Sequence, residues 1–594
     1  MQTLNDVHHQ FATFFKSVNL QPYAYLVSKN LAEGHICLGL GDLEKEVENL
    51  PAVYKDTTFS LEGLTAEPMV SIENGEKQPF ILHNNRLYLQ RYFNYESIIL
   101  NRIMDLINTE SALHLQRVQS ITDQIEFIAG LFNSAKTTVS QTDWQLGAAI
   151  TAVLNNFTII TGGPGTGKTT TVAKILAILF SINGGLKVAL AAPTGKAAAR
   201  MAESLKNAAL NIGESFIEKF QSLEPSTIHR LLGSIPDSPY FRHNKSNPLN
   251  YDVVIIDESS MLDVALFAKL LDSIGQHTRL ILLGDKDQLA SVEAGSLFGD
   301  LCQAQDKLNL FTTERATLIN SFASETYRQI GIDSIVTNSL HTLFQHIVEL
   351  KHSHRFVSGE GIGRFSKAII ENDVAVVKEF LVQGADEQVT VDLSYSDKIF
   401  EEFVLGYADY IQEPDIKTAL NKLNNLRILC AIRGGQQGLL VMNRKAESLL
   451  AEKGLLTYTS EFYLNRPIII TSNNYALGLY NGDVGIVRPD EKGLLKAWFE
   501  DAQGNLKSII PGLISNAETV FAMTIHKSQG SEFNQVLVSL PAADNVSILT
   551  RELLYTGVTR AKKKVFVQGT ENVILHAVHE KVNRASGISA RFHQ

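Results

Sequence analysis

A glycine-rich loop between an apolar strand and an apolar helix constrains this chain more than any other feature. Segment 158–170 reads TIITGGPGTGKTT. The fixed positions of its G-x-x-x-x-G-K-T pattern are Gly162, Gly167, Lys168 and Thr169. Small residues let backbone N–H groups wrap phosphate oxygens, and the N-terminus of the next helix adds a favourable dipole. Residues 157–160 suit a buried strand, and 171–180 are apolar at helical spacing. The segment therefore predicts a nucleoside triphosphate site.

Two residues of this loop have distinct expected roles. Lys168 supplies a positive charge for the β- and γ-phosphates, and the Thr169 hydroxyl suits Mg²⁺. The residues expected to contact the nucleotide from this loop are Gly162, Gly163, Pro164, Gly165, Thr166, Gly167, Lys168, Thr169 and Thr170. A mere glycine turn is the alternative interpretation, and the flanking strand and helix argue against it.

A second apolar run, 253–256, ends in Asp257 and Glu258. Ligands of open α/β sheets bind at the carboxyl ends of the strands. Asp257 is therefore expected to hold magnesium, and Glu258 to polarise an attacking water, which favours hydrolysis. A solvated pair of carboxylates is the alternative. A third run, RLILLGDKDQ, leads to Gln288, which can sense the γ-phosphate or be a simple loop amide.

The order of the apolar runs indicates an α/β fold with several domains. Strand-like and helical runs alternate from about 140 to 312, which predicts a parallel sheet with helices on both faces. A second strand-bearing set follows residue 425, interrupted by hairpin-like pieces with an Asn481-Gly482 turn signal. We predict an N-terminal α+β domain at 1–115, a linker at 116–139, a first domain at 140–345, a second at 346–594, and a small SH3-like β-barrel inserted at about 467–511.

Composition restricts the function classes. Hydrophobic residues make up 44% and charged residues 20% of the 594 residues, which is typical of globular proteins. No apolar run reaches the roughly 18–20 residues that span a bilayer. Three scattered cysteines, Cys37, Cys302 and Cys430, suit a reducing cytoplasm, where we expect the protein. The net charge of −10 argues against an overall basic coat but allows a local basic groove.

The ordered motifs resemble superfamily 1 helicases, in particular the RecD family, the alpha subunits of exodeoxyribonuclease V. WQLGAA resembles the glutamine motif that reads adenine, and LAAPTGKAAARMAESL and STIHRLLG resemble segments that contact DNA. IDESSMLD and GDKDQLASVEAG resemble motifs II and III. HSHRF, ETVFAMTIHKSQGSEF and RELLYTGVTRAKK resemble motifs IV, V and VI. ALGLYNGDVGIV lies where the family carries its small barrel.

The resemblance implies two RecA-like domains with ATP and Mg²⁺ in the cleft between them. Gln145 would then read the adenine, Arg355 would contact the γ-phosphate, and Arg560 would be the arginine finger. His354 stands where the family commonly has an aromatic residue. Travel along single-stranded DNA in the 5′→3′ direction is implied too. The expected DNA contacts are Pro193, Thr194, Lys196, Thr227, His229, Thr524, His526, Lys527 and Ser528.

The family also implies partners and leaves alternatives open. We expect a helicase subunit that acts on single strands and duplex ends, in double-strand break repair and recombination, with the beta and gamma subunits docked on residues 1–115. A stand-alone helicase of the related long form has helix-hairpin-helix repeats in its N-terminal extension, and residues 1–115 contain no paired G-x-G hairpins. A non-motor regulatory subunit is the other alternative. We expect no nuclease site in this chain, and His8-His9 is too short and isolated for a metal cluster.

Overall fold

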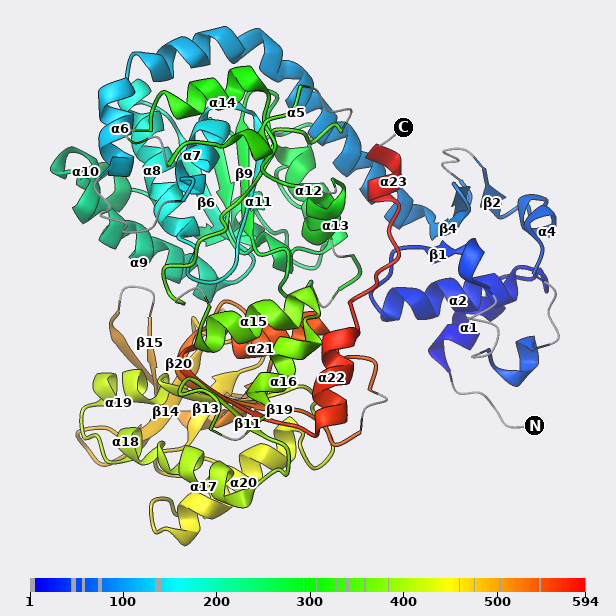
Figure 1. Cartoon of the computed structure of the whole chain (residues 1–594). Helices are drawn as coiled ribbons and strands as arrows, with labels where there is room; N and C mark the ends of the chain where they lie inside the picture. Colours follow the sequence, from blue (N-terminus) through cyan, green and yellow to red (C-terminus); the bar gives the residue numbers. More distant parts are fainter. Residues whose placement is uncertain are drawn as a thin grey trace.

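The computed structural model describes most of the chain (Figure 1). The residues described are 6–43, 50–55, 59–72, 77–133, 141–291, 293–295, 297–305, 307–323, 325, 328–337, 341–356, 359–382, 384–458, 460–474, 476–501, 504–543 and 546–592. Two lobes built on parallel sheets lie one above the other, and a smaller N-terminal domain lies beside them (Figure 1). In the described part of the chain, no helix is long and apolar enough to cross a bilayer.

The N-terminal domain packs short helices on a small sheet. Its four strands have the order β1-β4-β3-β2, with β3 and β4 joined by a tight turn at Asn84 and Asn85, which both have positive φ. Its core includes Tyr23, Leu26 and Phe80. The elements are α1 (Val7–Thr13), α2 (Gln21–Ala32), β1 (Leu38–Gly39), α4 (Leu61–Thr65), β2 (Val70–Ser71), β3 (Phe80–His83) and β4 (Arg86–Leu89).

The first lobe has a six-stranded parallel sheet of order β10-β5-β9-β8-β6-β7. The strands are β5 (Phe157–Thr161), β6 (Val188–Ala192), β7 (Ser226–Thr227), β8 (Val253–Ile256), β9 (Arg279–Gly284) and β10 (Ile347–Glu349). Apolar helices cover both faces, because the central strands are buried on both sides. The helices are α5 (Gln90–Thr122), α6 (Ile125–Asn133), α7 (Trp144–Leu154), α8 (Lys168–Ile182), α9 (Gly195–Ile212), α10 (Glu214–Gln221), α11 (Ile228–Leu232), α12 (Val264–Ser273), α13 (Leu297–Gln303) and α14 (Thr313–Asn320).

The second lobe has a five-stranded parallel sheet of order β11-β20-β19-β12-β18. Its strands are β11 (Val389–Asp392), β12 (Leu426–Cys430), β18 (Ala522–Thr524), β19 (Phe533–Ser539) and β20 (Ala561–Gln568). Its helices are α15 (Gly361–Glu371), α16 (Val374–Phe380), α17 (Asp397–Leu405), α18 (Ala408–Ile411), α19 (Ile416–Leu423), α20 (Leu439–Glu452), α21 (Arg551–Val558) and α22 (Glu571–His579).

A small antiparallel sheet interrupts the second lobe between β12 and β18. Its order is β16-β15-β14-β13-β17. The strands are β13 (Pro467–Ile470), β14 (Val484–Pro489), β15 (Leu495–Glu500), β16 (Leu506–Ile509) and β17 (Ala517–Thr519). The sheet has its own small core, which includes Ile468, Val487 and Phe499. It extends past the predicted limit at residue 511, because β17 returns to pair with β13.

Several predicted boundaries differ from the structure. The limit at residue 115 lies inside α5, which is one continuous helix. The predicted linker 116–139 is wrong where it is described, since Ile121 and Phe132 are buried in the first lobe, and 134–139 lie outside the described residues. The second domain cannot begin at 346, because β10 pairs with β5 of the first sheet.

The end of the chain returns to the first lobe and the N-terminal domain. A segment following α22 runs to α23 (Ile588–Phe592), which lies against α5 and α13 (Figure 1). Glu96 of α5, fully buried, holds this segment: its carboxylate accepts from the Gly587 N–H at 2.8 Å and pairs with Arg591 at 3.2 Å. Burial raises the pKa of Glu96. The predicted second domain, 346–594, is therefore too long at its end, because the last residues pack against the first lobe.

Replacement of Arg591 tests this anchor. Arg591→Ala leaves the Glu96 carboxylate buried without its cation, which costs roughly 3 kcal/mol locally. We expect faster amide hydrogen exchange in residues 585–592, measured by mass spectrometry. The control Lys367→Ala removes an exposed 3.8 Å pair with Glu371 and should change little. Unaltered protection of 585–592 in Arg591→Ala would contradict the anchor.

Candidate nucleotide site and nucleic-acid interface

The glycine-rich loop joins the end of β5 to the start of α8, as the sequence predicts. Gly165 has φ +78° and Gly167 has φ +85°, a region that side chains with a Cβ rarely adopt. Space is restricted as well. A Cβ at Gly165 would lie 2.3 Å from Cβ of Arg355, and one at Gly167 would lie 2.3 Å from Nε2 of Gln145. Gly165 therefore requires glycine on both conformational and steric grounds, whereas at Gly167 the backbone conformation decides, because the end of the Gln145 side chain can move.

Lys168 begins α8 and points back into the loop. Its Nζ donates to the carbonyl of Gly162 at 2.6 Å and to that of Gly163 at 3.2 Å. The ammonium group thus lies inside the curve of the loop, where it can reach a bound phosphate. Thr169 is half-buried in the next position. A hydroxyl and the nearby Asp257 carboxylate are oxygen donors, which fit Mg²⁺.

Carboxylates follow the two neighbouring strands β8 and β9. The Asp257 Oδ1 accepts from the Glu258 N–H at 2.8 Å, and Glu258 has φ +52°, which turns the chain sharply. Burial and the adjacent Glu258 charge raise the pKa of Asp257 to about 6, although Lys168 opposes them. Asp285 follows β9, and burial raises its pKa to about 6 as well. Negative charge is therefore concentrated beside Lys168.

Gln288 lies in this acidic group and faces the second lobe. Its Nε2 donates to Asp285 Oδ2 at 2.9 Å, and the Tyr555 hydroxyl of α21 donates to the same oxygen at 3.0 Å. The next residue, Leu289, donates its N–H to Thr556 Oγ1 at 3.0 Å and accepts from Gln529 Nε2 at 2.7 Å. Gln288 therefore lies between two residues that contact the second lobe, Asp285 and Leu289, and its role as a γ-phosphate sensor stays a prediction.

Arg560 of the second lobe is buried, near enough to the first lobe for the charge of Glu258 to affect its pKa. Its Nε donates to the Thr556 carbonyl at 3.2 Å, and its Nη1 donates to the Ser531 carbonyl at 3.3 Å. Burial lowers the pKa of Arg560, and the negative charges of Glu258 and Glu532 oppose that shift. The guanidinium is therefore oriented by backbone carbonyls and lies in the field of the first lobe's carboxylate.

Arg355 follows β10 and is tied to the glycine-rich loop. Ser353 Oγ donates to the Pro164 carbonyl at 3.0 Å, and the His354 N–H donates to the Gly165 carbonyl at 2.8 Å. From this position Arg355 Nη2 donates to Glu532 Oε1 at 2.6 Å. Arg355 thus lies beside the loop, as a phosphate contact requires.

Gln145 lies at the other end of the loop, in the first turn of α7. Its Nε2 donates to the Thr166 carbonyl at 3.2 Å, and Lys174 Nζ donates to its Oε1 at 3.4 Å. The ring of His354 lies 3.5 Å away and packs edge-on against His352. His354, the residue before Arg355, therefore lies beside Gln145.

The predicted DNA contacts of the first lobe gather at one edge of its sheet. Pro193 and Thr194 follow β6, Thr227 ends β7, and Ala192 pairs with Thr227, so the two segments are neighbours. Lys196 is exposed in the first turn of α9. His229 is also exposed, with its ring 5.6 Å from that of Phe241, so it is not a core histidine.

In the second lobe the predicted contacts follow β18. Thr524 ends the strand, and His526 and Lys527 are half-exposed beyond it. Ser528 is an exception, because it is fully buried and its Oγ donates to the Ile525 carbonyl at 2.7 Å. Its hydroxyl is committed to the turn, and contact of Ser528 with DNA stays a prediction.

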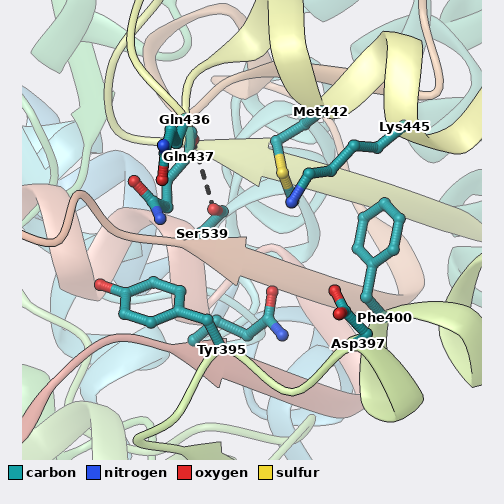
Figure 2. A pocket seen from close by; sticks show the side chains of 9 residues that line it. Tyr395, Asp397, Phe400, Gln436, Gln437, Met442, Lys445 and Ser539 are labelled. Carbon is teal, nitrogen blue, oxygen red and sulfur yellow. Dashed lines mark hydrogen bonds between the residues drawn. The ribbon is translucent and has the colours of Figure 1, made fainter.

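A separate small cavity lies in the second lobe, away from the glycine-rich loop. Figure 2 shows Tyr395, Gln437 and Ser539 around it, and Ser539 Oγ donates to the Gln437 carbonyl at 3.3 Å. Its volume is about 30 Å³, the space of roughly one water molecule. It is too small for a nucleotide, so the glycine-rich loop remains the candidate site.

The sequence analysis missed the residues that link the lobes. Tyr555, Arg200 and Glu532 all lie within motifs quoted above, but each makes its contact with a residue distant in sequence. Glu532 accepts from both Arg200 and Arg355 and lies 3.3 Å from Lys562. The available signal was Glu532 itself, an acidic residue at the end of the segment ETVFAMTIHKSQGSEF, and it does not identify the partners.

Comparison with known proteins assigns the chain to a family. Residues 1–88 match the model described as RecBCD enzyme subunit RecD, N-terminal domain. Residues 145–294 match the AAA domain, and residues 519–568 match the UvrD-like helicase C-terminal domain. These matches fall on the N-terminal domain, on the first lobe with the glycine-rich loop, and on the second lobe.

Similar proteins extend this result. The chain is 34% identical to the RecBCD enzyme subunit RecD of Mycolicibacterium smegmatis over 581 residues, which cover 95% of this chain and 92% of that one. It is 36% identical to the same subunit of Haemophilus influenzae, over 75% of this chain and 72% of that one. A crystal structure of Bacteroides Pif1 bound to ssDNA is 17% identical, with a TM-score of 0.37, over 72% and 91%. The chain therefore belongs to the RecD family of RecBCD enzyme subunits.

Proposed function

We propose that this chain is an ATP-dependent DNA helicase subunit of exodeoxyribonuclease V, acting with the beta and gamma subunits in double-strand break processing and recombination. The observation that carries the proposal is that the glycine-rich loop, the Asp257–Glu258 pair and a buried Arg560 meet at the boundary between two lobes with parallel sheets. ATP with Mg²⁺ would be held by Lys168 and Thr169. Magnesium would supply charge neutralisation at the phosphates.

The residues around this site divide the chemistry between the lobes. Glu258 would orient the attacking water, and Lys168 would bind the β- and γ-phosphates. Arg560, fixed by two carbonyls, would stabilise charge that develops on the γ-phosphoryl group. Because Arg560 comes from the second lobe, hydrolysis would depend on how closely the lobes approach. That dependence lets each cycle of hydrolysis move the lobes.

The predicted DNA contacts support a strand that crosses both lobes. Thr194, Lys196 and Thr227 lie at the carboxyl edge of the first sheet, and Lys527 follows a strand of the second. Hydroxyls, lysines and backbone N–H groups suit phosphate contacts without sequence reading. Alternate movement of two such contact sets along a strand is translocation. We propose 5′→3′ travel from the family, and we propose that the inserted sheet is a small SH3-like β-barrel.

Two alternatives have less support. The ATP-dependent RecD2 DNA helicase of Deinococcus radiodurans is 29% identical over 69% of this chain and only 47% of its own length. By contrast, residues 1–88 match the N-terminal model of the RecBCD subunit, which favours a partner-docking N-terminal domain. A non-motor subunit would not need Lys168, Glu258 and Arg560 in working positions. Three buried free thiols agree with a cytoplasmic location.

Lys168→Ala should abolish the motor. Without the ammonium group, ATP hydrolysis stimulated by single-stranded DNA should fall about 100-fold or more, because a preorganised phosphate contact is lost. The measurement is phosphate release in the presence of poly-dT, by the purified chain and by its complex with the beta and gamma subunits. The exposed Lys206→Ala on α9 serves as a control and should behave as wild type. Unchanged unwinding with Lys168→Ala would favour the regulatory alternative.

Arg560→Ala should separate binding from chemistry. We expect kcat for DNA-stimulated hydrolysis to fall about 10³-fold or more, while the affinity for ATP changes little. Arg560→Lys should not restore activity, since an ammonium cannot reproduce the fork geometry. The exposed Lys563→Ala is the matched control on β20. A loss confined to KM would show that Arg560 binds ATP without a role in the transition state.

Polarity is tested on tailed duplexes. The purified chain and its complex should unwind a duplex with a 5′ single-stranded tail, and Lys168→Ala should remove that activity. The chain alone should leave the DNA intact in the presence of magnesium. Strict preference for a 3′ tail would contradict the proposed direction, and degradation that survives purification and depends on another carboxylate would reveal a nuclease.

A further inference from the structure

Glu532 has contacts that its place in the nucleic-acid segment does not explain. It lies after Ser528 in the turn before β19, with a side chain that is 11% exposed. Its Oε1 accepts from Arg355 at 2.6 Å and also from Arg200, and its Oε2 lies 3.3 Å from Lys562. Burial alone would raise the pKa of Glu532, but Arg200 and Arg355 outweigh it and hold the pKa well below its usual range. The carboxylate therefore remains ionised.

The first of these cations belongs to the nucleotide site. Arg355 is carried by a segment that bonds to the loop carbonyls of Pro164 and Gly165. One nitrogen of its guanidinium, Nη2, is engaged by Glu532. The other, Nη1, is buried and has no hydrogen-bond partner among the residues that the structure describes. A buried arginine donor without an acceptor, next to a phosphate-binding loop, is suited to a second anionic partner.

The second cation belongs to the nucleic-acid interface. Arg200 lies on α9, one turn after the exposed Lys196, and its Nη1 donates to the Gly530 carbonyl at 3.4 Å. A movement of Glu532 therefore acts on the same helix that presents Lys196 to a strand. The same movement acts on the turn that contains Lys527, because Glu532 follows this turn only a few residues later in the chain. One carboxylate thus joins the phosphate loop to both sets of predicted DNA contacts.

We propose that Glu532 is a positioning residue that competes with the terminal phosphate of ATP for Arg355 and, through Arg200, transmits that competition to the DNA-binding surface. This inference rests on the proposed function. Carboxylates and phosphates present the same kind of paired acceptors to a guanidinium, so Arg355 can exchange one for the other. When Arg355 turns to the phosphate, Glu532 loses this pair and keeps its pairs with Arg200 and Lys562. The ion pairs that hold the two lobes together then change.

The test measures how nucleotide and DNA binding influence each other. The affinity of the full chain, alone and in its complex, for a fluorescent oligo-dT is measured by anisotropy with and without AMP-PNP and magnesium. The ratio of the two affinities is the coupling factor. In Glu532→Gln, we expect this factor to fall about fivefold or more. We expect AMP-PNP to bind as tightly as in wild type or more tightly, because its competitor for Arg355 is weakened.

Further variants distinguish positioning from folding. Loss of one partner of a buried pair destabilises a protein, so the double variant Arg200→Gln, Glu532→Gln, which keeps the net charge, is measured beside the single one. It should fold and still lack coupling. Glu379→Gln removes a 2.5 Å pair with Arg364 elsewhere in the second lobe and should leave coupling unchanged.

The outcomes separate the inference from the proposed function. Coupling within twofold of wild type in Glu532→Gln and in the double variant would overturn the inference and leave the motor intact. Weakened AMP-PNP binding together with a lowered melting temperature in both variants would also overturn it, since that pattern describes a structural ion pair. Wild-type protein whose ATP hydrolysis ignores DNA would instead refute the proposed function.

Discussion

Buried polar and charged groups of the two lobes face each other across the boundary between the two sheets. Asp285 of the first lobe accepts from Tyr555 of the second, and Arg560 lies in the field of Glu258. Removal of such groups from water without partners costs several kcal/mol each. The active arrangement therefore exists only when the lobes are close, and the approach of the lobes and the completion of the site are one event.

The same physics keeps this boundary reversible. The electrostatic attraction within a buried ion pair roughly equals the free energy that the two ions lose on leaving water, so the net contribution of the pair to stability is small. The interface around Glu532 combines three cations with one carboxylate, and a phosphate can replace that carboxylate as a partner of Arg355. A boundary built on exchangeable partners can open and close at modest cost. A boundary of apolar side chains could not respond to a charged ligand in this way.

The sequence predicts the local structure around the glycine-rich loop well, because it depends on neighbouring residues. The glycine-rich loop needs only consecutive residues, and Asp257 and Glu258 follow an apolar run that can be read as a buried strand. The layout of the chain was less predictable. Whether β10 pairs with the first sheet depends on tertiary contacts, and so does the return of the last residues to Glu96.

The sequence also could not predict which side chains pair when the residues are far apart in the chain. Ser528 has a residue type that suits phosphate contact, but its burial is decided by the turn around it. Glu532 is visible in its motif, whereas its partners Arg200 and Arg355 are separated from it by much of the chain. Such partners can be known only once the two sheets are placed against each other.

The distance between the lobes during hydrolysis tests the central claim most directly. The three native cysteines are buried, so dyes attach selectively to cysteines introduced at the exposed Leu210 of α9 and Leu440 of α20. Single-molecule energy transfer on oligo-dT should alternate between two values when ATP and magnesium are present. The alternation should cease in the Lys168→Ala background. A single, unvarying transfer value while wild-type protein hydrolyses ATP on DNA would contradict the account.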